Sequence, residues 1–175
     1  MYRFIWLLLV VALLSGCGRQ KTTPVDTAKE KQAIESAITK FGKAYESKDL
    51  STMTTLLSTS GELMWFGTDS AEVIKSVAQW ETQMKNDWQV FESVKFGEVR
   101  NLSIQVASDG QLASAVYEVP LDMTIGGQLS HALFRFGCAL KKENGEWRYI
   151  QGVAGVATVG QSSAELVAKM KEAKK

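Results

Sequence analysis

Two side chains suited to proton transfer are predicted to face each other on neighbouring strands. The only histidine, His131, lies on predicted strand 128–142, and Asp122 lies on predicted strand 111–125. Both belong to the face opposite the apolar one. An acid and a base there could form a dyad, but exposed charge pairs across strands are far commoner. Only a bulge at Pro120 would turn Asp122 inward. Asp122 is therefore a weak catalytic candidate, which needs burial and a raised pKa to act as a base.

Nucleophilic and metal chemistry have no support in the sequence. No G-x-S-x-G elbow occurs, and Ser130 and His131 are adjacent, so they point to opposite faces of a strand. One histidine and one free thiol cannot supply a set of zinc ligands, so we expect no metal and no cofactor. Cys138 sits in an apolar alternating run, which is typical of a small buried hydrophobe.

Residues 1–16 are typical of a secretory signal, because Arg3 precedes an apolar stretch at residues 4–14 and small residues follow. The stretch is too short to cross a hydrocarbon layer of about 30 Å comfortably. The sequence LSGC that ends at Cys17 resembles the lipobox of bacterial lipoproteins. That resemblance implies a diacylglyceryl thioether on Cys17, cleavage before it, and acylation of the freed amine by a fatty acid such as palmitate.

The lipobox implies a place in the cell envelope. The anchor would lie on the outer side of the cytoplasmic membrane or in the outer membrane facing the periplasm, and Gly18, rather than aspartate, weakly favours the outer membrane. Residues 17–27 are predicted to be the lipidated cysteine and a flexible, polar tether. Lipidation of Cys17 would leave Cys138 without an intramolecular disulfide partner.

The composition is that of one globular domain. The chain has 175 residues, of which 45% are hydrophobic and 22% charged, which is enough to form a single core. Without Arg3 the basic and acidic residues are equal in number. No cluster of basic and aromatic residues follows the pattern of a nucleic-acid surface, so we expect no nucleic-acid partner.

The hydrophobic periodicity predicts helices first and strands afterwards. A capping box at Thr27 and Glu30 opens a long amphipathic helix, and a short helix follows at residues 51–57. A strand is predicted at 63–66, and Asp69 with Glu72 is expected to cap a third helix. The inward positions of that helix are Val73, Val77, Trp80 or Glu81, Met84 and Trp88.

From residue 90 the apolar period changes to two. The predicted strands are 91–107, 111–125, 128–142 and 147–159, with turns at 108–110, 126–127 and 144–145. Gly97 and Pro120 are expected to mark bulges. Ser162 and Glu165 then cap a final amphipathic helix within 161–175. This order predicts an α+β domain with helices packed on a curved antiparallel β-sheet.

Three segments resemble the SnoaL-like branch of the nuclear transport factor 2 superfamily. They are AYESKDLSTMTTLLS after the first helix, WFGTDSAE, and RFGCALKKENGEWRYIQ across the last hairpin. The resemblance covers about residues 30–158, within a domain assigned to 28–160. It implies a cone-shaped fold with a pocket between helices and sheet, which some relatives use for isomerase, dehydratase or cyclase chemistry. Fold alone does not transfer an activity.

The pocket is predicted to be aromatic and to lack a general base. Where many SnoaL-like relatives carry histidines, this chain has Gln151, Val153 and Gly155, which cannot exchange a proton near neutral pH. The residues expected to bind a ligand there are large apolar side chains with a few polar tips: Tyr45, Trp65, Trp80, Met84, Tyr117, Met123 and Gln151. The alternative is that they simply fill the core.

Three functions remain open from the sequence. The first is a membrane-anchored domain that binds a small apolar ligand or an envelope partner without catalysis. The second is an isomerase or lyase with Asp122 as base and Tyr45 or Tyr117 as oxyanion donor. The third is an assembly module that forms a homodimer through the outer sheet face and docks its C-terminal helix.

Overall fold

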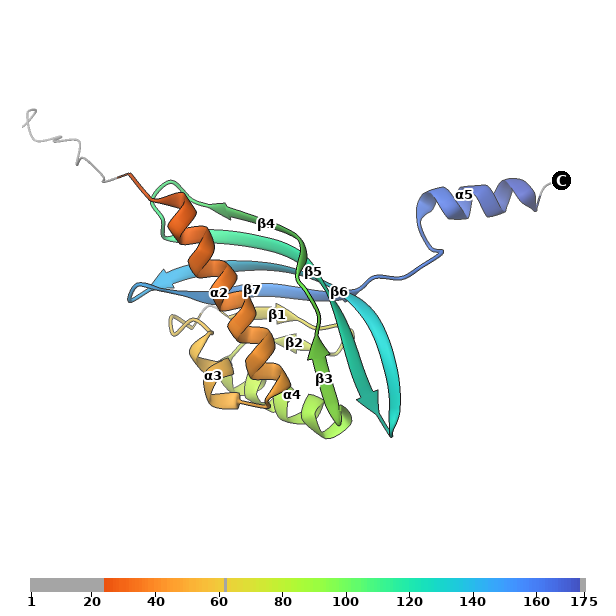
Figure 1. The fold of residues 1–175 in the computed structure, drawn as a ribbon, viewed down its shortest axis with the longest axis horizontal. Helices are drawn as coiled ribbons and strands as arrows, with labels where there is room; N and C mark the ends of the chain where they lie inside the picture. Colours follow the sequence, from red (N-terminus) through yellow and green to blue (C-terminus); the bar gives the residue numbers. More distant parts are fainter. Residues whose placement is uncertain (1–23, 62, 174–175) are drawn as a thin grey trace, which may run out of the picture.

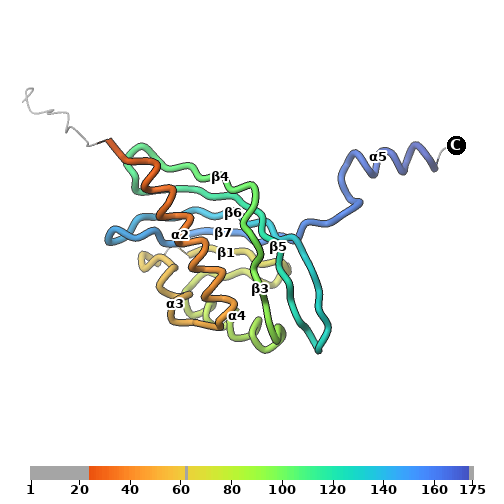
Figure 2. Tube along the Cα trace, in the orientation of Figure 1, coloured from red at the N-terminus to blue at the C-terminus, as the bar shows by residue number. Residues whose placement is uncertain are grey.

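The computed structural model describes residues 24–61 and 63–173. The predicted signal, Cys17 and most of the predicted tether lie outside these residues. The elements, in chain order, are α2 (Thr27–Glu46), α3 (Leu50–Thr55), β1 (Met64–Phe66), β2 (Val73–Ile74), α4 (Val77–Val90), β3 (Ser93–Phe96), β4 (Arg100–Val106), β5 (Leu112–Ile125), β6 (Gln128–Glu143), β7 (Glu146–Val156) and α5 (Ser163–Glu172). Helices α2, α3 and α4 lie against the inner face of a curved sheet, while α5 projects away from it (Figures 1 and 2). This arrangement confirms the predicted α+β fold.

The sheet is mixed rather than wholly antiparallel. Its strand order is β2-β1-β7-β6-β5-β3, and β4 pairs with a further part of β5. The hairpins β5-β6 and β6-β7 are antiparallel, as predicted, and positive φ angles at their turns explain the glycines Gly126, Gly127 and Gly145. Strand β1, however, runs parallel to β7. It can do so because it enters from α3 instead of from a hairpin.

The first predicted long strand is divided at Gly97, and the bulge expected at Pro120 is absent. The Gly97 N–H donates to the Pro120 carbonyl at 2.8 Å, and a Cβ on Gly97 would lie 2.6 Å from Pro120 Cγ. The β5-β6 register is continuous from Leu112 to Ile125. The alternation of side chains on β5 is therefore never reversed.

A bulge that the sequence pattern does not predict occurs in β7. Leu140 pairs with Tyr149 while Ala139 pairs with Gln151, so Ile150 is the extra residue. An extra residue reverses the alternation beyond it. Gln151 is consequently exposed, whereas Trp147 and Tyr149 before the bulge are buried.

Two predicted capping boxes are wrong because their glutamates have other partners. Asp26 caps α2 by accepting from the Lys29 N–H at 3.1 Å. Glu30 instead accepts from Lys142 Nζ at 2.6 Å and from Trp147 Nε1 at 2.8 Å.

The second of these boxes was expected to open the third helix. Helix α4 begins only at Val77, capped by Ser76. Glu72 Oε2 accepts from the Asp69 N–H at 3.1 Å within the loop between β1 and β2. Val73 therefore lies in β2 rather than on the inward face of a helix. The box at Ser162 and Glu165 is confirmed, although no residue of α5 is buried.

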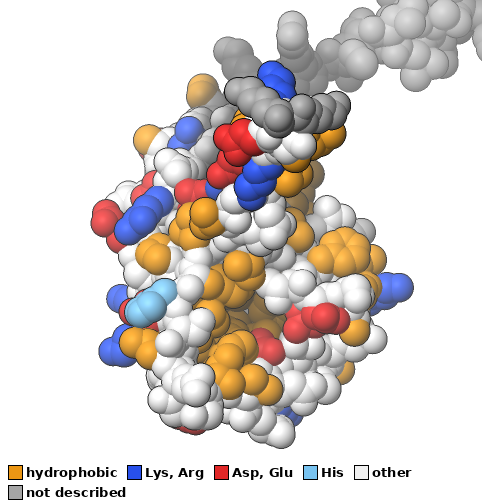
Figure 3. Space-filling model, turned by 90° about the vertical axis from the view of Figure 1, so that its right-hand side faces the viewer, with side chains coloured by type: hydrophobic (Ala, Val, Ile, Leu, Met, Phe, Trp, Pro, Cys, Tyr) orange, Lys and Arg blue, Asp and Glu red, His pale blue; other side chains and the backbone are white. Residues whose placement is uncertain are grey.

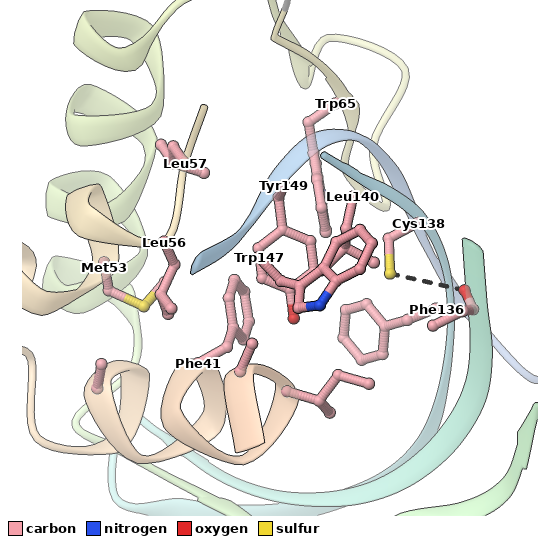
Figure 4. Close-up of a cluster of buried hydrophobic side chains, with 14 of the residues drawn as sticks. Phe41, Met53, Leu56, Leu57, Trp65, Phe136, Cys138, Leu140, Trp147 and Tyr149 are labelled. Carbon is pink, nitrogen blue, oxygen red and sulfur yellow. Dashed lines mark hydrogen bonds between the residues drawn. The ribbon is translucent and has the colours of Figure 1, made fainter. Parts of the chain in front are cut away.

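The core lies between α2 and the inner face of the sheet, and it is rich in aromatic rings (Figure 4). Phe41 of α2 packs edge to face on Trp80 and Tyr149, with centroids 6.0 and 5.7 Å apart. Cys138 is buried, and its Sγ donates to the Ala115 carbonyl at 3.6 Å. Burial raises the pKa of this thiol to about 12, so the predicted inert, apolar role is confirmed.

Glu143 ties the loop after α3 to the end of β6. Its carboxylate accepts from Ser58 Oγ at 2.5 Å and from the N–H and hydroxyl of Thr59, each at 2.9 Å. Its side chain is 10% exposed. These hydrogen bonds, first of all that from Ser58, lower its pKa from 4.5 to about 2.

Glu143→Gln should therefore lower stability by about 1–3 kcal/mol near neutral pH, since hydrogen bonds to a charged acceptor are lost. The native pKa lies below the unfolded one, so the carboxylate stabilises the fold above about pH 4.5 and loses this effect as pH falls towards 2. Urea unfolding across this pH range should show that the difference in the free energy of unfolding between variant and parent becomes smaller at low pH. A difference that does not change with pH would show that the charge on Glu143 is not its cause.

Candidate functional site

A cavity opens between α2, α4 and the inner face of the sheet. Its volume is about 130 Å³. Aromatic and other apolar side chains form most of its wall, and they come from both helices and from β1, β2, β3, β5, β6 and β7. A hollow framed by hydrophobic side chains, with acidic side chains beside it, is visible on the face drawn in Figure 3.

Five of the seven predicted ligand-binding residues line this cavity: Tyr45, Trp65, Trp80, Met84 and Met123. The other two lie elsewhere. Tyr117 points inward, as predicted, but it stacks on Phe136 at 5.2 Å and lies outside the cavity wall. Gln151 is turned to solvent by the β7 bulge.

One part of the wall is polar and consists of four connected side chains, which we call the acidic wall: Tyr45, Glu72, Gln83 and Asp87. The Tyr45 hydroxyl donates to Asp87 Oδ2 at 3.0 Å. Gln83 Nε2 donates to Asp87 Oδ1 at 2.8 Å and to Glu72 Oε1 at 3.1 Å. All four line the cavity. The two carboxylates thus share one amide as their common donor.

Glycine at position 67 leaves room for this arrangement. Gly67 also lines the cavity, and a Cβ there would overlap the Glu72 side chain, 2.7 Å from its Cβ. The Gly67 N–H donates to the Glu72 carbonyl at 2.9 Å. The β1-β2 loop therefore holds Glu72 at the edge of the cavity by main-chain contacts.

The electrostatics of the acidic wall are set by burial and by its two negative charges. Burial raises the pKa of Asp87, the Glu72 charge adds to this, and the hydrogen bonds from Gln83 and Tyr45 oppose it. Burial and the charge on Asp87 raise the pKa of Tyr45, so its hydroxyl stays protonated and donates. Among the described residues that line the cavity, none is lysine, arginine or histidine.

The predicted pair of Asp122 and His131 lies outside the cavity. Asp122 Oδ1 is 2.6 Å from His131 Nδ1, and the two side chains are 54% and 68% exposed. Glu118 and Arg135 form a second pair along the same strands at 2.7 Å. With no bulge at Pro120, Asp122 has neither the burial nor the position that a base in the cavity requires.

Sequence reasoning missed Asp87, Gln83 and Glu72, although part of the signal was present. Gln83 and Asp87 follow Trp80 by three and seven residues, so they share its helical face. A search for apolar stripes disregards polar residues at those positions. Glu72 was assigned to a helix cap and its place beside the cavity had no local signal.

The comparisons with known proteins agree with the fold. The model of the SnoaL-like domain family matches residues 34–158. The chain belongs to the SnoaL-like domain family. No curated protein matches it. Within the residues that the structure describes, no helix is long and apolar enough to span a membrane, and no group of three or more potential ligands could hold a metal ion.

Solved structures similar to this SnoaL-like domain share its fold at low sequence identity. A nuclear transport factor 2-like protein from Salmonella enterica is 20% identical, with a TM-score of 0.66, and the match covers 78% of this chain and 98% of that one. A hexachlorocyclohexane dehydrochlorinase, LinA type 2, is 11% identical, with a TM-score of 0.67 and coverage of 76% and 88%. A candidate scytalone dehydratase from Novosphingobium aromaticivorans is 10% identical, with a TM-score of 0.66 and coverage of 75% and 87%.

Proposed function

We propose that this SnoaL-like domain is held at a membrane of the cell envelope through a lipid on Cys17 and binds a small, largely apolar molecule without transforming it. The observation that supports binding is the cavity itself, whose wall outside the acidic wall is mostly apolar and rich in aromatic rings. Apolar pockets with a few convergent polar groups are the usual form of small-molecule sites.

The volume of the cavity limits the size of the molecule. An apolar cavity of roughly 150 Å³ in another protein binds benzene. At about 130 Å³, this cavity suits a molecule of about one ring, or an elongated one of which one end enters. The aromatic faces would supply contact area, and the acidic wall would fix its orientation.

Binding without catalysis is favoured by how the acidic wall is satisfied. Each Asp87 oxygen already accepts a hydrogen bond, from Tyr45 and from Gln83. The only histidine pairs with Asp122 outside the cavity. The groups in the cavity that could move a proton are therefore two carboxyl groups, Asp87 and Glu72, whose oxygens already accept hydrogen bonds from the protein.

An isomerase or lyase remains the second candidate, with Asp87 in the place that the sequence suggested for Asp122. The observation in its favour is a cavity carboxyl group with a raised pKa beside the Tyr45 hydroxyl, a pattern found at many sites of proton transfer. A homodimer is the third candidate. Val116 and Val153 are half exposed on the outer sheet face, and α5 presents Leu166 and Met170 to solvent.

Native mass spectrometry of the full chain, purified in detergent from its own host, tests these candidates. We expect a bound molecule of about one ring to co-purify. Ala154→Leu should remove it, because residue 154 lines the cavity and a longer side chain would fill the space. Val153→Leu is the matched control, since the neighbouring side chain lies on the exposed face.

Other outcomes favour the other candidates. A co-purified molecule that the protein converts on incubation would support the enzyme. A chain that is always empty but remains dimeric would support the assembly module and leave the cavity residues as core.

A further inference from the structure

The donors of the acidic wall are already used, so its free hydrogen-bonding capacity is that of an acceptor. Gln83 has two side-chain N–H groups, and they go to Asp87 and Glu72. The Tyr45 O–H goes to Asp87. Each carboxylate oxygen has more than one lone pair, so Asp87 and Glu72 can each accept a further hydrogen bond. A molecule that meets this wall must donate.

The charges of the cavity favour a positively charged donor. Two carboxyl groups line it, and no lysine, arginine or histidine is among its described lining residues. The nearby Lys48 is directed elsewhere, since its Nζ donates to the carbonyls of Trp88 and Phe91 at 3.1 and 3.2 Å. The aromatic rings in the rest of the wall, which include those of Trp65 and Trp80, also attract cations.

A buried donor in the same cavity has no acceptor from the protein. Trp80 lines the cavity and is 1% exposed, and its Nε1 has no hydrogen-bond partner. A buried N–H without an acceptor is destabilising. The ammonium group of a ligand cannot accept from it, whereas a water molecule enclosed with the ligand can.

We propose that the molecule bound in this cavity is an organic ammonium ion of about one ring, whose nitrogen donates to Asp87 and Glu72 while its ring lies against Trp65 and Trp80. This inference rests on the proposed function, because it assumes that the cavity binds a small molecule. It adds the chemical class of that molecule. An anion would be repelled by the two carboxylates, and a neutral ring would leave them without a counter-charge.

Three probes of similar shape separate charge from size: benzylamine, which is a cation near neutral pH, benzyl alcohol, which is neutral, and benzoate, which is an anion. Isothermal titration calorimetry of the full chain should give an affinity for benzylamine about tenfold or more above that for benzyl alcohol, as expected when a charged donor meets a carboxylate. Benzoate should not bind measurably.

Two variants test whether the preference for benzylamine comes from the acidic wall. Asp87→Asn and Glu72→Gln should each weaken benzylamine about tenfold while changing benzyl alcohol by less than about threefold. Asp122→Asn is the matched control, since it removes the same charge from an exposed position outside the cavity. If Asp87→Asn fails to fold by circular dichroism, Glu72→Gln still decides the result.

The pH dependence adds a second readout. Tyr45 and Glu72 are the titratable groups that interact with Asp87, and its pKa is raised. As pH falls through that pKa, Asp87 becomes neutral, so benzylamine affinity should fall while benzyl alcohol affinity stays constant.

Two failures are distinguishable. If benzyl alcohol binds the parent as well as benzylamine does, or if neither variant affects benzylamine, the ammonium inference is overturned and the binding cavity stands. If no probe binds at all, the proposal of a one-ring binding cavity fails, and the inference fails with it.

Discussion

Gly152→Ala should destabilise the fold and close the cavity, although it adds a single methyl group. A Cβ at residue 152 would overlap the Trp65 ring, 2.6 Å from its Cη2. Trp65 cannot move away without disturbing its neighbours or entering the cavity, because it lies against Phe41, Trp80 and Tyr149 at centroid distances of 6.2, 5.1 and 6.0 Å. Overpacking of this kind costs about 1–3 kcal/mol. We expect a loss of this size in urea unfolding.

The same substitution should also impair binding, because Trp65 lines the cavity and can be displaced only towards other rings or into the cavity. The control is Gly155→Ala on the same strand, where a Cβ meets nothing within 4 Å. Calorimetry with benzylamine should show binding lost in Gly152→Ala and kept in Gly155→Ala. Equal stability and equal binding in the two variants would show that Trp65 is not held as tightly as its contacts indicate.

The fold was predictable because its elements follow simple periodicities. The alternation along residues 111–125 identifies Ala115, Tyr117, Val119 and Leu121 as inward, and all four are buried. The hairpin turns follow from glycines at positions that need positive φ. The parallel pairing of β1 with β7 was not predictable, since a strand of three residues has too little pattern to fix its partner.

The candidate site was predictable only in its apolar half. Trp80 and Met84 appear in any search for a buried helix face, and both line the cavity. The side chain of Gln151 was predicted on the wrong face because one extra residue, Ile150, reverses the alternation of side chains along β7. Nothing in the local sequence marks that bulge. Asp87 was missed because a search for apolar stripes disregards polar residues, and Glu72 was missed because its link to Asp87 through Gln83 is a tertiary contact between a loop and a helix.

The proposed ligand class also bears on how the cavity is built. A carboxyl group beside aromatic rings is costly to leave charged, which is the cause of the raised pKa of Asp87. Gln83 and Tyr45 offset part of that cost, and a bound cation would offset more of it. Binding of an ammonium ion should therefore lower the pKa of Asp87, since ligand and proton compete for the same carboxylate.

Cys17→Ser should move the whole population of the chain out of the membrane fraction. The lipobox predicts that the anchor forms on this thiol alone, and a serine hydroxyl cannot form the thioether. Each buried methylene contributes about 0.8 kcal/mol, so a single acyl chain binds a membrane reversibly, whereas two or more acyl chains anchor a protein stably. Because the substitution removes all acyl chains at once, the membrane-bound fraction of the protein should change in an all-or-none way. Fractionation of host cells measures where the protein is located, and mass spectrometry of the intact protein shows whether the signal segment, residues 1–16, is still attached.

The matched control is Cys138→Ala, which removes the other cysteine of the chain. The Cys138 side chain is buried in the hydrophobic core, so this variant should remain in the membrane fraction with the mass of an acylated protein. If Cys17→Ser stays at the membrane and its mass shows that residues 1–16 have been removed, the attachment lies in the domain, where the exposed apolar side chains of α5 are the surface to test.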